Sequence, residues 1–409
     1  MELLSPAGNL EKLKTSVRFG ADAVYCGAGS FSLRAPETAF SLDDLAEGIN
    51  FAHLHGCKVY LALNVFPFDE DLDAMKEYFK EAAKLGIDAV IVSDPGVVSL
   101  VQSCDAGIKI HLSTQANTTN SESTRFWRNQ GVDRIVLARE LSLDHVALIR
   151  KNVPDIELEV FVHGAMCVAY SGRCLLSRVM SNRSANQGLC TQPCRWEYQM
   201  RETSRSENFT VSEDEHGSYI LNSRDLCMIE HIPLLAAAGV DSIKIEGRMK
   251  TTYYVAATTR VYRAALNSFE TLGSSYRFNP EWLAELTRVS HRPYTTGFYL
   301  SDPDVGTEYT KDSSYIRGYD FVGTVESDDP EHGFLKIKAR NRFVVGDELE
   351  FLDPQYDQII RLRVDMIKDC KTGAYIKAAH NGYIVEITAV RIKGDPISPE
   401  AIIRRKLEL

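Results

Sequence analysis

Four cysteines close together in the middle of the chain are the residues best suited to metal chemistry. Cys167, Cys174, Cys190 and Cys194 follow the spacing C-x6-C-x15-C-x3-C, and Cys227 lies farther along. Thiolates that converge from one stretch of chain are the ligands of a tetrahedral zinc ion or of an iron–sulfur cluster. Structural zinc sites usually show two short cysteine pairs, and this stretch has one, so the spacing favours a cluster over zinc. The alternative is that these are free cysteines packed as small hydrophobic residues.

Arginines accumulate in the same stretch, although the protein as a whole is acidic. Residues 160–196 contain no Asp or Glu but hold Arg173, Arg178, Arg183 and Arg195, in a chain whose net charge is −10. A local cluster of arginines on an acidic protein predicts a surface that contacts RNA phosphates. Scattered arginines on a solvated surface are the alternative.

Three further candidates for catalytic residues lie at or just after the ends of two apolar runs. His163 lies near the end of the run 157–164, and Glu246 and Arg248 lie at the end of the run 242–247. A histidine can move a proton and a carboxylate can orient it, while the arginine fork can hold the carboxylate of a small anionic co-substrate. A buried Glu–Arg pair that only fixes the strand end is the alternative. The polar residues that end other runs are Ser5, Asn64, Asp94, Gln115, Arg139 and Glu140.

Eight apolar runs and the helical segments between them are the elements that must position these residues. The runs are 2–5, 23–27, 58–64, 89–94, 109–115, 134–140, 157–164 and 242–247. Apolar runs that alternate with amphipathic segments are typical of parallel strands covered by helices, and eight such units predict an α/β fold, a TIM-like (β/α)8 barrel. An open doubly wound sheet is less favoured, because no Gly-rich phosphate-binding motif follows the first run. In a barrel, the carboxyl ends of the strands carry the active site.

The pattern changes along the chain and predicts three parts. Residues 1–270 form the barrel domain, with a cysteine-containing insertion at 165–241, and residues 271–315 form a connector. Residues 316–409 hold six short alternating runs between 321 and 390, which predict a small all-β barrel domain.

The chain shows no sign of export or of a membrane partner. It has no run of 18 apolar residues, and residues 1–8 lack the features of a signal peptide. Clustered thiols fit a reducing compartment, so we expect a cytoplasmic protein. The sequence does not determine the oligomeric state.

The stretch EVFVHGAMCVAYSGRCLLS at 159–177 resembles the signature of the family historically called peptidase U32. That signature, E-x-F-x2-G-[SA]-[LIVM]-C-x4-G-x-C-x-[LIVM]-S, is matched by Glu159, Phe161, Gly164, Ala165, Met166, Cys167, Gly172, Cys174, Leu176 and Ser177. The resemblance extends to STQANTTN at 113–120 and IKIEGRMK at 243–250. The C-terminal part resembles an elongation-factor-like β-barrel, so the resemblance covers nearly the whole chain.

The resemblance implies two kinds of activity. Some family members are described as collagenase-like proteases. Others take part in oxygen-independent hydroxylation: of a wobble uridine in tRNA with prephenate as the apparent hydroxyl donor, of a cytidine in ribosomal RNA, or of a ubiquinone precursor. Several carry a [4Fe-4S] cluster on four cysteines. This chain most resembles the tRNA-uridine branch, which implies Cys167, Cys174, Cys190 and Cys194 as ligands, with Cys227 as an alternative fourth ligand.

The residues themselves favour RNA modification over proteolysis. A protease needs an activated nucleophile or a metal-bound water, and the chain contains neither an H-E-x-x-H nor a G-x-S-x-G motif. We therefore expect a tRNA-modifying enzyme that forms 5-hydroxyuridine, with an iron–sulfur cluster and prephenate as the small anionic co-substrate. A collagenase-like protease and a non-catalytic protein with a structural metal are the alternatives.

Overall fold

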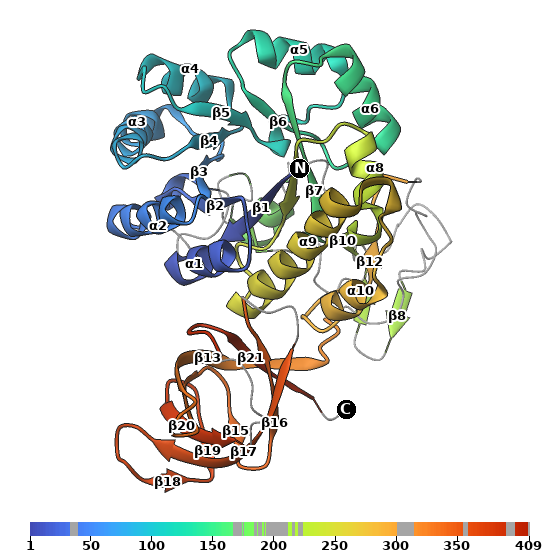
Figure 1. Ribbon diagram of the computed structural model, residues 1–409. Coiled ribbons are helices and arrows are strands. Elements are labelled where there is room, and N and C mark those ends of the chain that lie inside the picture. Colours follow the sequence, from blue (N-terminus) through green and yellow to red (C-terminus); the bar gives the residue numbers. More distant parts are fainter. Residues whose placement is uncertain are drawn as a thin grey trace.

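The computed structural model describes most of the barrel and of the C-terminal domain (Figure 1). The described residues are 1–32, 40–166, 174, 176–183, 186, 190–191, 193, 212–214, 217–219, 224–300, 315–354, 359–389 and 397–407. Most of the predicted insertion therefore lies outside the described residues. This applies to Cys167, Cys194, Arg173 and Arg195 and to the side chain of Arg178.

In the described part of the chain, eight parallel strands close into a barrel. β1 to β7 are neighbours in order, and β11 pairs with both β1 and β7, which closes the ring. The strands are β1 (Glu2–Ala7), β2 (Ala23–Gly27), β3 (Lys58–Leu63), β4 (Ala89–Val92), β5 (Lys109–Leu112), β6 (Arg134–Val136), β7 (Glu157–Ala165) and β11 (Ser242–Ile245). Each strand begins where an apolar run was predicted. Because the ring of strands is closed, the predicted TIM-like barrel is confirmed and the alternative of an open sheet is wrong.

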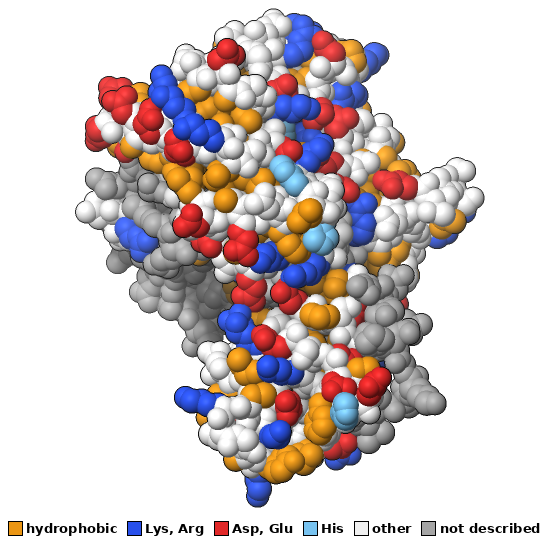
Figure 2. Space-filling model, turned by 60° about the vertical axis from the view of Figure 1, so that its left-hand side comes forward, with side chains coloured by type: hydrophobic (Ala, Val, Ile, Leu, Met, Phe, Trp, Pro, Cys, Tyr) orange, Lys and Arg blue, Asp and Glu red, His pale blue; other side chains and the backbone are white. Residues whose placement is uncertain are grey.

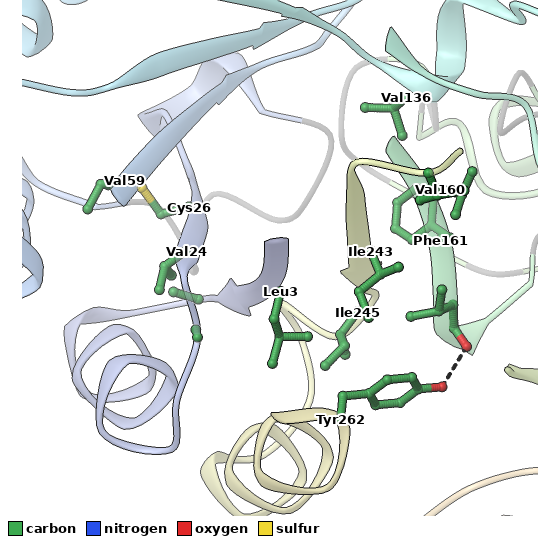
Figure 3. Packing of buried hydrophobic residues seen from close by; sticks show 14 of the residues in the cluster. Leu3, Val24, Cys26, Val59, Val136, Val160, Phe161, Ile243, Ile245 and Tyr262 are labelled. Carbon is green, nitrogen blue, oxygen red and sulfur yellow. Dashed lines mark hydrogen bonds between the residues drawn. The ribbon is translucent and has the colours of Figure 1, made fainter. Parts of the chain in front are cut away.

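Helices surround the barrel (Figure 1) and bury an apolar layer against the strands, to which Leu3, Val24 and Ile243 belong (Figure 3). The helices are α1 (Leu10–Arg18), α2 (Leu42–Leu54), α3 (Asp69–Lys84), α4 (Pro95–Ser103), α5 (Ser121–Asn129), α6 (Leu143–Asn152), α8 (Ile232–Ala237) and α9 (Thr252–Leu272). Several begin at a polar residue whose side chain accepts a backbone N–H, as Asn9 does for α1. No helix in the described residues is long and apolar enough to cross a membrane.

A network of charged side chains lies inside the barrel, toward the amino ends of β1 and β6. Arg134 donates to Glu2 and, over 3.2 Å, to Glu159. Lys244 donates to the other oxygen of Glu159 over 2.8 Å. Glu159 and Lys244 are buried, and each charge faces an opposite charge, as buried ions require. This network links the side chains of β1, β6, β7 and β11 inside the barrel.

Two short strands extend the sheet beyond the barrel at β7. β10 (Asp225–Cys227) runs antiparallel to β7, and β12 (Tyr294–Thr295) pairs with β10. β10 follows the cysteine insertion, and β12 belongs to the predicted connector, which also holds α10 (Pro280–Leu286). The connector is therefore attached to the barrel beside the end of β7.

The C-terminal domain is an antiparallel barrel in which the order is β16-β21-β13-β14-β20-β17, closed by pairing of β16 with β17. Its strands are β13 (Tyr319–Asp329), β14 (Phe334–Ala339), β15 (Phe343–Val344), β16 (Glu348–Leu352), β17 (Ile360–Asp369), β18 (Tyr375–Ile376), β19 (Ala378–Ala379), β20 (Ile384–Ala389) and β21 (Ile402–Lys406). A small all-β domain was predicted, and the short strands β15 and β19 and the barrel strand β21 were missed.

A fully buried arginine joins the two domains. Arg404 of β21 donates to both carboxylate oxygens of Glu285 on α10, to Glu350 over 2.8 Å and to the hydroxyl of Tyr253 over 3.0 Å. Glu350 belongs to the C-terminal domain, whereas Tyr253 belongs to α9 of the barrel domain. The C-terminal domain is thus held against α9 and α10.

Candidate active site at the mouth of the barrel

Arg248 lies at the carboxyl ends of β11 and β2. Its side chain is 6% exposed, and Nη1 donates to the hydroxyl of Ser32 over 2.5 Å. A Cβ on Gly27, the last residue of β2, would lie 3.0 Å from the same Nη1. The guanidinium therefore packs directly on the end of β2, where a side chain at position 27 would crowd it.

Two more cations lie against aromatic rings of the barrel strands. Nζ of Lys244 is 4.4 Å from the centroid of the Tyr25 ring, and Cζ of Arg139 is 3.9 Å from the centroid of the Phe161 ring. Burial lowers the pKa of Lys244, and the neighbouring Glu159 opposes this shift. Lys244 is neutralised by Glu159, so the cations at the mouth are Arg248, after β11, and Arg139, after β6; we call these two residues the cationic arc, which suits an anionic ligand.

The opposite side of the mouth is built from amides and hydroxyls. Oε1 of Gln115 accepts hydrogen bonds from Asn64 Nδ2 over 2.9 Å, from Ser93 over 3.1 Å and from Ser113 over 3.2 Å. Asn64 follows β3, Ser93 follows β4, and Ser113 and Gln115 follow β5, at the 3-10 turn η3 (Thr114–Ala116). We call these four residues the amide arc. The charged residue in this region, Asp94, caps the first turn of α4 instead.

His163 lies between the strands and α9. The pairing of β7 with β11 shifts register here: Phe161 is opposite Lys244, and His163 is opposite Ile245. The imidazole packs near Tyr254 and Tyr262 of α9, and neither ring nitrogen has a hydrogen-bond partner among the described residues. Burial lowers the pKa of His163 to about 3, which favours the neutral ring, and its role in proton transfer stays a prediction.

Glu246 lies beside His163, as their positions at the ends of β11 and β7 predicted. Its backbone N–H donates to the His163 carbonyl over 2.9 Å, and its own carbonyl accepts from Tyr254 over 3.0 Å. The chain can approach this closely because Gly164, with φ at +102°, has no side chain: a Cβ there would lie 2.6 Å from the Glu246 carbonyl oxygen. The structure therefore brings the ends of β7 and β11 together.

Cys174 and Cys190, two of the candidate metal ligands, lie on segments that are joined by a hydrogen bond. Sγ of Cys174 is 3.3 Å from the backbone N–H of Leu176, which donates to it. Three residues after Cys174, the hydroxyl of Ser177 accepts from the backbone N–H of Thr191 over 3.0 Å, and Thr191 directly follows Cys190. Cys174 is half-buried and Cys190 is exposed. These accessible thiols, on neighbouring segments, suit metal ligands.

Asn186 attaches this cysteine-bearing segment to the barrel. Its side-chain oxygen accepts a hydrogen bond from the backbone N–H of Cys174 over 3.2 Å. Its backbone carbonyl oxygen accepts one from the backbone N–H of Phe66 over 3.3 Å. Phe66 lies two residues after Asn64 of the amide arc. Cys174 is therefore held beside the carboxyl end of β3, at the mouth.

Cys227 is in a different environment. It is buried on β10, its thiol is hydrogen-bonded with Tyr262, and burial raises its pKa to about 12. Cys227 is packed as a core residue on β10, and its role as the alternative fourth ligand stays a prediction. Among the described residues, no three His, Cys, Asp or Glu side chains are arranged to hold a metal ion; Cys167 and Cys194 lie outside those residues.

The predicted RNA-binding arginines are described only in part. Arg183 is exposed and follows α7 (Leu176–Ser181), the helix that carries position 178. Arg173 and Arg195 lie outside the described residues. On the face of the molecule shown in Figure 2, the acidic and basic side chains of the described residues are interspersed. The assignment of these arginines stays a prediction.

The sequence missed some residues of the mouth. Ser93 and Ser113 lie within predicted apolar runs, and their polarity near the run ends was a usable signal. Ser32 had no such signal, because it follows a short 3-10 turn, η1 (Gly29–Phe31), rather than a strand. One predicted candidate, Ser5, instead shares a hydrogen bond of 2.9 Å with Thr259 of α9.

The sequence matches known families and relatives along most of its length. The family model described as peptidase family U32 matches residues 8–308, and its C-terminal domain model matches 317–404. The chain is 38% identical over 356 residues to tRNA hydroxylation protein P1 of Bacillus subtilis, covering 87% of this chain and 84% of that protein. It is 37% identical over 430 residues to tRNA hydroxylation protein P of Escherichia coli, covering 94% and 92%.

A relative with a different name is also similar. The collagenase of Porphyromonas gingivalis is 34% identical over 381 residues, covering 88% of each chain. The relatives thus differ in the activity that their names state, while the family models match both domains found here. With these matches, and with the barrel, the cysteine-bearing insertion and the C-terminal β domain in place, the chain belongs to peptidase family U32.

Proposed function

We propose that this protein is an RNA hydroxylase that acts on tRNA and forms 5-hydroxyuridine at the wobble position. Relatives named for tRNA hydroxylation match both domains over most of their length. The structural observation that carries the proposal is the link through Asn186, which holds Cys174 beside the amide arc. Thiol ligands beside the open end of a barrel suit a redox centre that acts on a substrate bound in the mouth.

We further propose that Cys167, Cys174, Cys190 and Cys194 hold a [4Fe-4S] cluster. When bound, the cluster would supply one-electron redox chemistry at the mouth. The N–H donated to Cys174 Sγ supports this, because hydrogen bonds to sulfur tune such clusters. Zinc bound by the same thiolates is the alternative.

The cationic arc supports binding of a small anionic co-substrate, for which family resemblance implies prephenate. Prephenate carries two carboxylates, and Arg248 and Arg139 place positive charge on one side of the mouth. Arg248 offers a planar fork that can hold a carboxylate through two N–H groups. His163 and Glu246, at the ends of β7 and β11, would position the residues on this side of the mouth.

The RNA substrate must present one base to the mouth. A base that reacts inside a protein pocket leaves its stack and is held by hydrogen bonds to its edge. Arg173, Arg178, Arg183 and Arg195 of the insertion would bind the surrounding phosphates, with an affinity that falls as salt rises.

Purified protein tests this proposal. The protein, prepared without oxygen and supplied with iron and sulfide, is incubated with a tRNA transcript and prephenate, and the nucleosides are measured by mass spectrometry. We expect 5-hydroxyuridine with the wild type and none with Cys174→Ser, while Cys370→Ser, at an exposed cysteine of the C-terminal domain, behaves as the wild type. Stoichiometric zinc without iron, and no modified nucleoside, would overturn the proposal.

Proteolysis is the second candidate, because one relative is named a collagenase. The hydroxyls of the amide arc argue against it, since Ser93 and Ser113 donate to Gln115 and not to a histidine that could activate them. Gelatin cleavage by metal-free protein, unchanged by Cys174→Ser, would favour proteolysis.

A further inference from the structure

Arg139 is a half-buried arginine at the mouth of the barrel that has no acidic partner in the described part of the chain. It lies three residues after Val136, where β6 ends, and no carboxylate of the described residues forms an ion pair with it. The buried Arg134 and Arg404, by contrast, each pair with at least two carboxylates. A cation that is largely shielded from water needs an opposite charge, which for Arg139 would have to come from a ligand.

The guanidinium of Arg139 is held in one orientation by β7. Its Cζ lies 3.9 Å from the centroid of the Phe161 ring, and Nη1 donates to the backbone carbonyl oxygen of Ala165, the last residue of β7, over 3.0 Å. Phe161 is itself buried, and its carbonyl oxygen accepts from the hydroxyl of Tyr299 over 2.7 Å. The ring fixes the plane of the guanidinium, and the bond to Ala165 fixes its rotation within that plane. The directions of its other N–H groups are therefore set before any ligand binds.

The other N–H groups of Arg139 form an open edge. Nε is buried and has no hydrogen-bond partner among the described residues, and Nη2 has none in that part of the chain either. Nε–H and the neighbouring N–H of Nη2 point in the same direction, at a spacing that matches the two oxygens of a carboxylate. Leaving a buried donor unpaired is costly, and a carboxylate bound along this edge would remove that cost and supply the missing negative charge.

We infer that the Nε–Nη2 edge of Arg139 binds one carboxylate of a small dianionic co-substrate, an inference that rests on the proposed function. Arg248 would hold the other carboxylate, so the site selects a dianion over a monoanion. A free carboxylate suits the edge better than an RNA phosphate does, because a small molecule reaches a buried Nε more readily than a polymer backbone. Ala165, which fixes the guanidinium, is two residues before Cys167 in the sequence, so the co-substrate would lie beside the start of the cysteine-bearing insertion.

Equilibrium binding tests the inference without requiring turnover. The whole chain, loaded with iron, is titrated in a calorimeter with prephenate, which has two carboxylates, and with phenylpyruvate, which has one. We expect the wild type to bind prephenate about tenfold more tightly than phenylpyruvate, or better. Arg139→Gln should weaken prephenate binding by about tenfold or more and phenylpyruvate binding much less, because a monoanion can pair with Arg248 alone. Arg139→Lys keeps the charge without the paired N–H groups and should recover only part of the affinity for prephenate.

Arg128→Gln, at an arginine of α5 that pairs with Asp155 on the surface, is the matched control and should bind both ligands as the wild type does. Unchanged prephenate affinity in Arg139→Gln overturns the inference, as does equal affinity of the wild type for the two ligands, which needs no variant to fold. If Arg139→Gln loses affinity for tRNA alone, the edge belongs to an RNA phosphate and the inference is also wrong. If the wild type binds prephenate as expected but forms no 5-hydroxyuridine, the proposed function fails while the inference stands.

Discussion

Arg248 Nη1 and the Ser32 hydroxyl form a 2.5 Å hydrogen bond at the end of β2. This contact ties the segment after β11 to the segment after β2, on the side of the mouth where we expect the anionic co-substrate. Gly27 allows it, because any side chain there would meet both partners: a Cβ would lie 3.0 Å from the guanidinium and 3.2 Å from the hydroxyl oxygen. Two predictions concern this contact.

Gly27→Ala should impair the site with little effect on folding. The φ of Gly27 lies outside the left-handed region, so alanine is tolerated by the backbone, but its methyl group would push Arg248 away from Ser32. We expect KM for prephenate to rise about tenfold, which corresponds to about 1.4 kcal/mol of binding free energy. Gly318→Ala is the matched control, since no atom lies within 4 Å of its Cβ position. Equal KM values for the two variants would contradict this prediction.

Arg248→Lys should keep the positive charge and lose the planar fork of N–H groups of the guanidinium. A lysine ammonium holds a carboxylate as a point charge, without the paired N–H geometry. We expect kcat/KM for prephenate to fall by about tenfold or more while the melting temperature changes little. Arg263→Lys, at a half-buried arginine that bonds Gly20 and Asp22 outside the barrel, should leave prephenate kinetics unchanged. Full activity of Arg248→Lys would remove carboxylate recognition from the role of Arg248.

His163 should make folding stability depend on acid pH. Its pKa is lowered from 6.5 to about 3 in the folded protein by burial, so between these values the unfolded chain binds a proton that the folded chain does not. Stability from this group is therefore constant above pH 6.5 and falls by about 1.4 kcal/mol per pH unit below it. Between pH 7 and pH 5, wild type should lose about 2 kcal/mol more than His163→Phe in urea unfolding. The exposed His55→Phe is the control; identical slopes for wild type and His163→Phe would disprove the burial argument.

Arg404 should be essential to the stability of the domain interface. Arg404→Met leaves the buried carboxylates of Glu285 and Glu350 without their shared guanidinium, and breaking a buried pair in this way costs about 3–5 kcal/mol. Arg361→Met, whose partly exposed side chain also pairs with Glu350, should cost less than about 1 kcal/mol. Urea unfolding followed by tryptophan fluorescence measures both. A similar midpoint for the two variants would mean that the interface depends on apolar contacts instead.

The barrel could be predicted because its strands are buried on both faces. Such strands are short apolar runs that do not depend on distant parts of the chain, as in Ala23–Gly27 and Ala89–Val92. β21 was missed because Arg404 and Arg405 follow its two isoleucines and interrupt the apolar pattern. Arg404 can be buried because residues 54 to 151 positions away supply its partners, which no local pattern reveals.

The candidate site was predicted less completely. Asn64 and Gln115 were found because a polar residue at the end of an apolar run is visible in the sequence. That His163 lies at the end of β7 was predictable, but the packing of its ring against Tyr254 and Tyr262 of α9 was not, because it depends on a distant helix and on a local shift of register between β7 and β11. The contact between Cys174 and the barrel was also hidden, since it passes through Asn186, a residue with no distinctive local pattern.

The most direct test of the central claim is the nucleoside content of tRNA from living cells, where any missing donor or partner is supplied. Cells that lack their own wobble-uridine hydroxylation are given the wild-type protein, Cys174→Ser or Cys370→Ser, and digested tRNA is analysed by mass spectrometry. We predict that the wild type and Cys370→Ser restore 5-hydroxyuridine and its derivatives, and that Cys174→Ser does not. Restoration by Cys174→Ser at the wild-type level, or by none of the three proteins at equal expression, would contradict the account.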